Sequence, residues 1–244
     1  MRTNRQARFE PNETMGLFIT FEGPEGSGKS TQARLLYERI QALGYPVILT
    51  REPGGTRISE LIRRILVDLR HTEMAPTTET LLFSAARAQL VSELVRPYLN
   101  TGGIVLCDRY ADSTFAYQGY GLGRDLDELH AITTIATGGL QPDLTFYLDL
   151  DVEAGLQRKR WARDRGSEAS KAVSSSGPPA EWNRLDARDL AYHQRVAAGF
   201  AELIRNNPER WRRCSAEQPL DQLAEQIFAA VEPILERVAR LEPH

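Results

Sequence analysis

Residues 23–30 read Gly-Pro-Glu-Gly-Ser-Gly-Lys-Ser, which matches the pattern G-x-x-x-x-G-K-[ST]. Small residues at this spacing let successive backbone N–H groups curl around phosphate oxygens. The lysine of such a loop reaches the outer phosphates, and the serine hydroxyl beside it can ligate Mg²⁺. The segment therefore predicts a nucleotide phosphate-binding loop in which Lys29 and Ser30 are the reactive side chains.

The residues on either side of this loop support the same interpretation. Residues 17–22 form a short apolar run typical of a strand, and residues 30–43 place Leu36, Ile40 and Leu43 at helical spacing. A helix that begins at the loop directs the positive end of its dipole toward a bound anion. The order of strand, loop and helix is the one that a phosphate site requires.

Apolar runs alternate with helical patterns along the rest of the chain. This alternation is typical of a parallel sheet flanked by helices, and 244 residues suit one substantial α/β domain. We expect residues 1–15 to be a flexible extension and residues 16–240 to be the domain. The expected strands are residues 17–22, 46–50, 104–108, 144–149 and 211–214, and the expected helices lie near residues 30–43, 57–69, 77–99, 125–137, 151–163, 186–206 and 218–239.

The overall composition narrows the classes of function. A net charge of −3 provides no overall basic field, so we expect no nucleic-acid partner. We expect no membrane span, because no segment is long and apolar enough, and the polar first 15 residues lack the apolar core of a secretory signal. Cys107 and Cys214 have neither metal-ligand spacing nor a disulfide framework, so we expect buried thiols in a reducing cytoplasm.

Charged and polar residues gather where the predicted strands end. In open α/β sheets, ligands bind at the carboxyl ends of the strands, so this placement predicts a binding site. A structural salt bridge is the alternative role for each residue taken by itself. The residues that follow the second, third and fourth strands include Arg51, Glu52, Asp108, Arg109, Ser113, Thr114, Tyr117, Gln118, Asp149 and Asp151.

Phe83 and Arg87 lie four residues apart on a predicted helix and therefore share one face. An aromatic ring beside a guanidinium group can stack on a nucleotide base while the guanidinium hydrogen-bonds the base edge. Considered alone, the spacing favours the simpler interpretation, in which Phe83 packs in the core and Arg87 lies on the surface.

Several of these segments together resemble the thymidylate kinase family. The resemblance runs from about residue 16 to the C-terminal helix, and the order and spacing of its motifs make it specific. With it, the interpretation of Phe83 and Arg87 changes to substrate contact. The motifs are the phosphate loop with Glu25, Arg51-Glu52-Pro53-Gly54-Gly55-Thr56, Leu82-Phe83-Ser84-Ala85-Ala86-Arg87, Asp108-Arg109-Tyr110 with Ser113-Thr114 and Ala116-Tyr117-Gln118-Gly119, Pro142-Asp143-Leu144-Thr145, Tyr147-Leu148-Asp149, Arg184-Leu185-Asp186 and Tyr192-His193.

The resemblance implies an enzyme of dTTP synthesis that transfers the γ-phosphoryl group of ATP to dTMP, giving dTDP and ADP. It implies a P-loop NTPase-type α/β fold, in which a parallel five-stranded sheet is flanked by helices and carries a lid. It also implies bound Mg²⁺ and a cytoplasmic homodimer. A kinase for another nucleoside monophosphate or a deoxynucleoside is the alternative, and a nucleotide-dependent switch is opposed by the lack of an Asn-Lys-x-Asp motif.

The resemblance further assigns roles to individual residues. It places the ATP phosphates on Gly23, Pro24, Glu25, Gly26, Ser27, Gly28, Lys29, Ser30 and Thr31, and Mg²⁺ on Ser30 and Asp108. It places dTMP on Glu25, Arg51, Phe83, Arg87, Arg109, Ser113, Thr114, Tyr117 and Gln118, with Arg51 and Arg109 as the clamp on its phosphate. The implied catalytic residues are Lys29, Asp108, Arg109, Arg160 and Arg163.

The phosphate loop lacks an arginine that some thymidylate kinases carry there. Family members without it are similar in placing basic residues in the lid, a role that fits Arg158, Arg160, Arg163 and Arg165. Residues 166–180 are small and polar with two prolines, so we expect a mobile inserted loop within a lid region of about residues 158–183.

Overall fold

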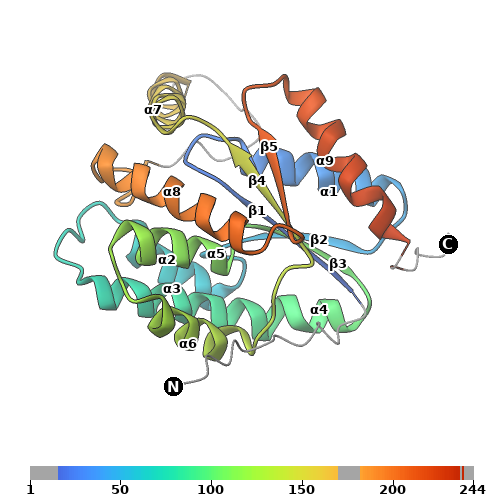
Figure 1. The fold of residues 1–244 in the computed structure, drawn as a ribbon, viewed down its shortest axis with the longest axis horizontal. Helices are drawn as coiled ribbons and strands as arrows, with labels where there is room; N and C mark the ends of the chain where they lie inside the picture. The colour runs from blue at the N-terminus through green and yellow to red at the C-terminus, as the bar shows by residue number, and fades with distance from the viewer. Residues whose placement is uncertain (1–15, 170–181, 237, 239–244) are drawn as a thin grey trace, which may run out of the picture.

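The centre of the molecule is a five-stranded sheet in the order β2-β3-β1-β4-β5, with every neighbouring pair parallel (Figure 1). This computed structural model describes residues 16–169, 182–236 and 238. The predicted fold class is confirmed. The strands are β1 (Leu17–Glu22), β2 (Val47–Arg51), β3 (Ile104–Asp108), β4 (Leu144–Asp149) and β5 (Trp211–Ser215).

Helical segments connect consecutive strands. Among the described residues, no helix is both long and apolar enough to cross a membrane. The described helices are α1 (Lys29–Ala42), α2 (Arg57–Val67), α3 (Pro76–Leu90), α4 (Arg96–Asn100), α5 (Ala111–Thr114), α6 (Leu126–Thr137), α7 (Val152–Ala169), α8 (Leu190–Asn206) and α9 (Leu220–Leu235), with the π-helical segments η1 (Val91–Val95) and η2 (Phe115–Gly121).

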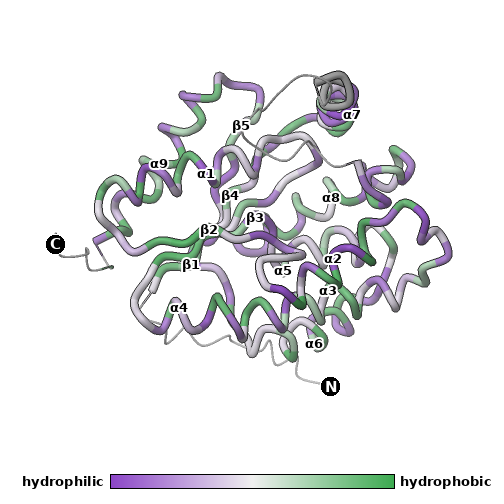
Figure 2. The backbone as a smooth tube through the Cα atoms, turned by 180° about the vertical axis from the view of Figure 1, so that it is seen from behind, coloured by the Kyte–Doolittle hydropathy of each residue, from purple (hydrophilic) through white to green (hydrophobic). Residues whose placement is uncertain are grey.

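The central strand β1 shows how the two faces of the sheet are covered. All six of its residues are buried, as expected for a parallel strand with helices on both sides. Ile19 and Phe21 pack into a core with residues of α1 and α9, whereas Phe18 packs on the opposite face with residues of α3, η1 and α4. Figure 2 shows the helices alternating between hydrophilic and hydrophobic stretches, as helices on a sheet surface do. Because apolar side chains cover both faces of the central strand, the polar residues of the site are placed at the strand ends.

Several predicted helix boundaries differ from the structure. The helix expected over residues 77–99 is divided into α3, η1 and α4, and Pro97 lies in the first turn of α4, where it has no N–H to donate. Residues 111–121, to which no helix was assigned from the sequence, form α5 and η2. Helix α8 begins only after Asp189, whose side chain accepts a hydrogen bond from the Tyr192 backbone N–H.

Helix α7 continues to Ala169, so the first residues of the predicted loop at 166–180 are helical. Residues 170–180 of that predicted insertion lie outside the described residues, as does the predicted extension at residues 1–15.

Candidate active site

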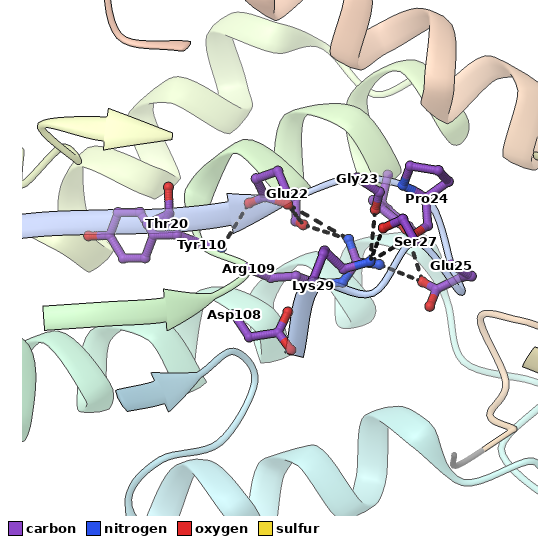
Figure 3. Close-up of polar contacts among 12 residues, drawn as sticks. Thr20, Glu22, Gly23, Pro24, Glu25, Ser27, Lys29, Asp108, Arg109 and Tyr110 are labelled. Atoms are coloured by element: carbon purple, nitrogen blue, oxygen red, sulfur yellow. Dashed lines mark hydrogen bonds and ion pairs between the residues drawn. The ribbon is translucent and has the colours of Figure 1, made fainter. Parts of the chain in front are cut away.

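The phosphate loop follows β1 at the carboxyl edge of the sheet (Figure 3). Lys29 is only 7% exposed, and its Nζ donates to the carbonyl oxygens of Gly23 at 3.1 Å and Pro24 at 2.7 Å. Burial, together with the neighbouring charge of Arg109, lowers the pKa of Lys29 to about 8. Because a nearby anion favours the charged form of a lysine, this buried ammonium group is suited to bind phosphate oxygens.

The loop is also in direct contact with the first turn of α7. Gly26 has a φ of 71°, and a Cβ added there would lie 2.2 Å from the carbonyl oxygen of Gly155. A Cβ on Gly155 would in turn lie 2.2 Å from the carbonyl oxygen of Glu25. Neither position accepts a larger residue without a backbone shift, so the two glycines allow α7 to pack tightly on the loop.

Ser30 and Asp108 provide oxygen atoms for a cation beside the loop. The Ser30 hydroxyl donates a hydrogen bond to Oδ2 of Asp108 at the end of β3. Mg²⁺ prefers oxygen ligands and is commonly held by one or two protein groups together with substrate phosphates. Within the described part of the chain, no group of three or more His, Cys, Asp or Glu side chains could hold a metal by itself. The donor set therefore fits Mg²⁺ that is bound jointly with a nucleotide.

Arg109 lies in a buried polar cluster just after β3 (Figure 3). Its Nη2 donates to Oε1 of Glu25 at 2.7 Å, and its Nη1 donates to the Ser113 hydroxyl at 3.2 Å. The guanidinium carbon lies 4.9 Å from the ring centre of Tyr117, whose hydroxyl donates to Oε1 of Glu25 at 3.0 Å. The structure thus brings together four predicted site residues from the phosphate loop, the end of β3, α5 and η2.

The backbone of Arg109 is strained. Its φ of 71° lies in the left-handed region, and no other described residue except glycine has a positive φ. Such conformations persist only where the surrounding structure enforces them, and they are concentrated at functional sites. The strained residue is also the one whose guanidinium group contacts Glu25 of the phosphate loop.

Glu22, the last residue of β1, belongs to the same cluster and was not among the predicted site residues. It accepts hydrogen bonds from the Tyr110 backbone N–H at 2.8 Å and the Ser113 hydroxyl at 2.7 Å, and Nη1 of Arg109 lies 3.7 Å away. Burial raises the pKa of Glu22 to about 7, although Arg109 opposes that rise. The signal in the sequence was an acidic residue that ends an apolar strand immediately before the loop.

Replacing Glu22 with glutamine is expected to weaken the pH dependence of stability. The carboxyl group has an ordinary pKa of 4.5 and a folded-state pKa of about 7, so the folded state binds its proton more tightly. Its contribution therefore lowers the free energy of unfolding as pH rises from about 4.5 to about 7, by roughly 3 kcal/mol for the full shift. Urea unfolding of both proteins at several pH values across this range measures the slope of the free energy of unfolding against pH. An unchanged slope in Glu22→Gln would contradict the assignment.

Arg87 is a buried residue of α3, only 1% exposed. Its Nε donates to Oε2 of Glu52 at 2.8 Å, and its Nη2 donates to the Thr114 hydroxyl at 2.9 Å. The surface position that helical spacing alone favoured for Arg87 is therefore wrong. Within the described part of the chain, Nη1 of Arg87 is buried without a hydrogen-bond partner. Because an unpaired buried donor is costly, Nη1 indicates a position where the acceptor atom of a ligand would be stabilising.

Two other predicted substrate residues lie on neighbouring elements. Phe83 is half-buried on α3, one helical turn before Arg87. Arg51 ends β2, where it pairs in register with Asp108, and its exposed Nη2 lies 3.3 Å from Oε1 of Glu60. In the structure, then, the side chain of Arg51 contacts a surface carboxylate, whereas Arg109 contacts the buried cluster.

Gln118, also predicted to contact substrate, joins a buried cluster around Glu79 of α3. Oε1 of Glu79 accepts from Nε2 of Gln118 at 2.9 Å, and Oε2 accepts from Arg184 at 2.5 Å and Arg188 at 2.6 Å. These contacts tie the segment before α8 to α3 and η2. Nothing in the helical pattern distinguishes Glu79 from a solvent-facing glutamate, so only the tertiary structure identifies this cluster.

Helix α7 carries the basic residues predicted for the lid. The guanidinium carbons of Arg160 and Arg163 lie 5.2 Å and 5.5 Å from the ring centre of Trp182. Nη1 of Arg158 donates to the carbonyl oxygen of Ala216 at 3.2 Å. None of these contacts is to the phosphate loop, so the catalytic roles of Arg160 and Arg163 stay predictions.

Lys159, which has no predicted role, does reach the phosphate loop. Its Nζ donates to Oε2 of Glu25 at 3.1 Å and to Oδ1 of Asp186 at 2.7 Å. Burial alone would raise the pKa of Glu25, but Arg109 and then Lys159 hold that pKa well below its usual range. Glu25 is therefore a carboxylate held by cations from two directions.

Comparisons with known proteins identify the family of the chain. A family model described as Thymidylate kinase matches residues 21–227. The chain is 68% identical over 228 residues to a thymidylate kinase of Roseiflexus castenholzii, covering 93% of this chain and 98% of that protein. It is 60% identical over 235 residues to a thymidylate kinase of Herpetosiphon aurantiacus, covering 93% of this chain and 100% of that protein.

A solved structure shows the same fold. The thymidylate kinase of Ehrlichia chaffeensis superimposes with a TM-score of 0.68 at 29% sequence identity, covering 89% of this chain and 98% of that one. The shared fold, the family match over most of the chain and the high identity to several relatives lead to one assignment. The chain belongs to the thymidylate kinase family.

Proposed function

We propose that this chain catalyses the reaction of its family, transfer of the terminal phosphoryl group of ATP to dTMP, giving dTDP and ADP in dTTP synthesis. The observation that carries the proposal is the buried cluster of Arg109, Glu25 and Tyr117 beside Lys29. A protein that only binds a nucleotide has no need of a second buried cation beside its phosphate loop. A kinase needs one, because the phosphates of two nucleotides meet there.

On the donor side, the loop N–H groups and Lys29 bind the outer phosphates of ATP. Ser30 and Asp108 would hold Mg²⁺, which would supply charge neutralisation on the phosphate oxygens. Lys29 contributes in the same sense, because its ammonium group is fixed before the reaction begins and need not reorganise as charge develops.

On the acceptor side, Arg109 and Arg51 bind the phosphate of dTMP. A guanidinium group can contact two phosphate oxygens at once, which orients the acceptor oxygen toward the donor. The acceptor phosphate is largely ionised near neutral pH, so the reaction needs positioning and charge stabilisation more than a strong general base. Arg160 and Arg163 are the candidates for added positive charge from α7.

The thymine ring lies over Phe83, and Nη1 of Arg87 donates to one of its carbonyl oxygens. This contact would satisfy the buried donor that has no partner in the described structure. Thr114 is positioned by Arg87 to contribute to the same pocket, and Tyr117 packs against the sugar. The hydrogen bond between Arg87 and Thr114 supports their joint placement beside the base.

We propose that the active form is a homodimer in the cytoplasm. Helix α2 exposes a stripe of apolar side chains at helical spacing, namely Ile58 at 40%, Leu61 at 47% and Ile65 at 44%. Large apolar groups aligned on one helix face favour burial against a second surface. Cys107 and Cys214 are buried free thiols, which is consistent with a reducing compartment.

The function is tested by a coupled ADP-release assay with ATP, Mg²⁺ and a panel of nucleoside monophosphates and deoxynucleosides. We expect the highest kcat/KM for dTMP. A Lys29→Met preparation, purified in parallel, controls for contaminating kinases. A clear preference for another monophosphate, or for a nucleoside without a phosphate group, would overturn the proposal.

A further inference from the structure

We propose that Lys159 is a positioning residue that connects α7 to the acceptor side of the active site through Glu25. The inference rests on the proposed function, because it gives Lys159 a part in the same phosphoryl transfer. The ammonium group of Lys159 contacts the carboxylates of Glu25 and Asp186.

The contacts of Lys159 form a buried ion triad that joins three parts of the chain. The side chain of Lys159 on α7 is 14% exposed, that of Glu25 in the phosphate loop is 14% exposed, and that of Asp186 before α8 is fully buried. The second oxygen of Asp186 accepts a hydrogen bond from the backbone N–H of Asn183 at 2.8 Å. The carboxylate of Asp186 is therefore held in place from both oxygens, and Lys159 connects it to Glu25.

The two oxygens of Glu25 have separate partners. Oε2 accepts from Lys159, whereas Oε1 accepts from Arg109 and from the Tyr117 hydroxyl. Without Lys159, Oε2 loses its partner, and the carboxylate is held through Oε1 alone, so its rotation about the last bond is less restricted. Rotation of Glu25 would then release the guanidinium group of Arg109 and the phenol of Tyr117 from the orientations in which they meet dTMP.

Lys159 does not hold α7 onto the loop by itself. The close backbone packing of Gly155 against Glu25 and Gly26 fixes the first turn of the helix independently of any side chain. Loss of the Lys159 charge should therefore change the orientation of the acceptor-side groups and leave the helix in place. Direct action of Lys159 on the transferred phosphoryl group would instead require its ammonium group to leave both carboxylates.

The test is a double-mutant cycle with Lys159→Met and Glu25→Gln, measured by steady-state kinetics with dTMP and ATP. In the wild-type background, Lys159→Met should lower kcat/KM for dTMP by roughly 10- to 100-fold, the scale of a small misplacement of a reacting group. The KM for ATP should change much less. In the Glu25→Gln background, the same substitution should have little further effect, because the residue through which it acts is already altered.

Three variants complete the design. Lys159→Arg should recover a large part of the loss, because a guanidinium group can also contact both carboxylates. Asp186→Asn should reduce kcat/KM for dTMP in the same direction, and it tests the triad should Lys159→Met fail to fold. Gln157→Met, an exposed neighbour on α7, should behave as the wild type.

Two outcomes would overturn the inference. Equal losses from Lys159→Met in both backgrounds would show that Lys159 acts independently of Glu25. A lower melting temperature with unchanged kcat/KM would show a purely structural role. Either result leaves the proposed function intact as long as the wild type phosphorylates dTMP, whereas a wild type inactive on dTMP would remove both.

Discussion

Replacing Lys29 with methionine is expected to reduce kcat for dTMP phosphorylation by roughly 10²-fold or more, the scale for loss of one preorganised electrostatic group. Methionine keeps the length and apolar stem of the side chain but removes the ammonium group that the carbonyl oxygens of Gly23 and Pro24 now orient. Because burial excludes water, no solvent dipole can substitute for that charge.

ADP release at saturating ATP and dTMP measures the effect, and thermal unfolding monitored by circular dichroism shows whether the variant is folded. The expected signature is a large loss of kcat with a native melting profile. A folded Lys29→Met protein with near-normal turnover would exclude the assigned role of Lys29 in charge stabilisation.

Replacing Arg87 with methionine is expected to weaken both dTMP binding and the fold. Loss of a charged hydrogen bond to the base should cost roughly 1.5–3 kcal/mol of dTMP affinity, while ATP affinity stays nearly unchanged. Removing the guanidinium group also leaves the carboxylate of Glu52 buried without its ion-pair partner, which should lower the free energy of unfolding by roughly 3–5 kcal/mol. Because burial raises the pKa of Glu52 to about 7, this destabilisation should diminish at acidic pH, where the carboxyl group is neutral.

A second substitution separates the two effects of Arg87. The double variant Arg87→Met/Glu52→Gln should recover much of the stability, since no charge is then buried alone, but it should not recover dTMP affinity. Urea unfolding and isothermal titration calorimetry provide the two readouts. Gln89→Met on the same helix, where Gln89 hydrogen-bonds the surface residue Glu93, is the matched control. Unchanged dTMP affinity in both Arg87 variants would count against base contact.

The sequence alone was sufficient for features that depend on neighbours along the chain. The spacing of residues 23–30 specifies the phosphate loop with Lys29 and Ser30, because its glycines, lysine and hydroxyl act within one turn. The three central strands β3, β1 and β4 were predictable for a similar reason, since burial on both faces produces continuous apolar runs. Placing Asp108 and Arg109 near the loop followed from a general rule, that parallel strands end at the same edge of the sheet.

The tertiary structure decided how the charged residues are paired. Arg87 meets Glu52 across 35 positions of sequence, and Lys159 meets Glu25 across 134. Helical spacing assigns Arg87 to a face of α3, but only the packing of α3 among neighbouring helices, with Glu52 against Arg87, makes that face buried. Pairing over such separations depends on how complete elements pack, so composition and periodicity carry no local signal for it. The same reason explains why the sequence could not distinguish Lys159 from the neighbouring arginines. The distinction required the structure, in which α7 packs on the phosphate loop.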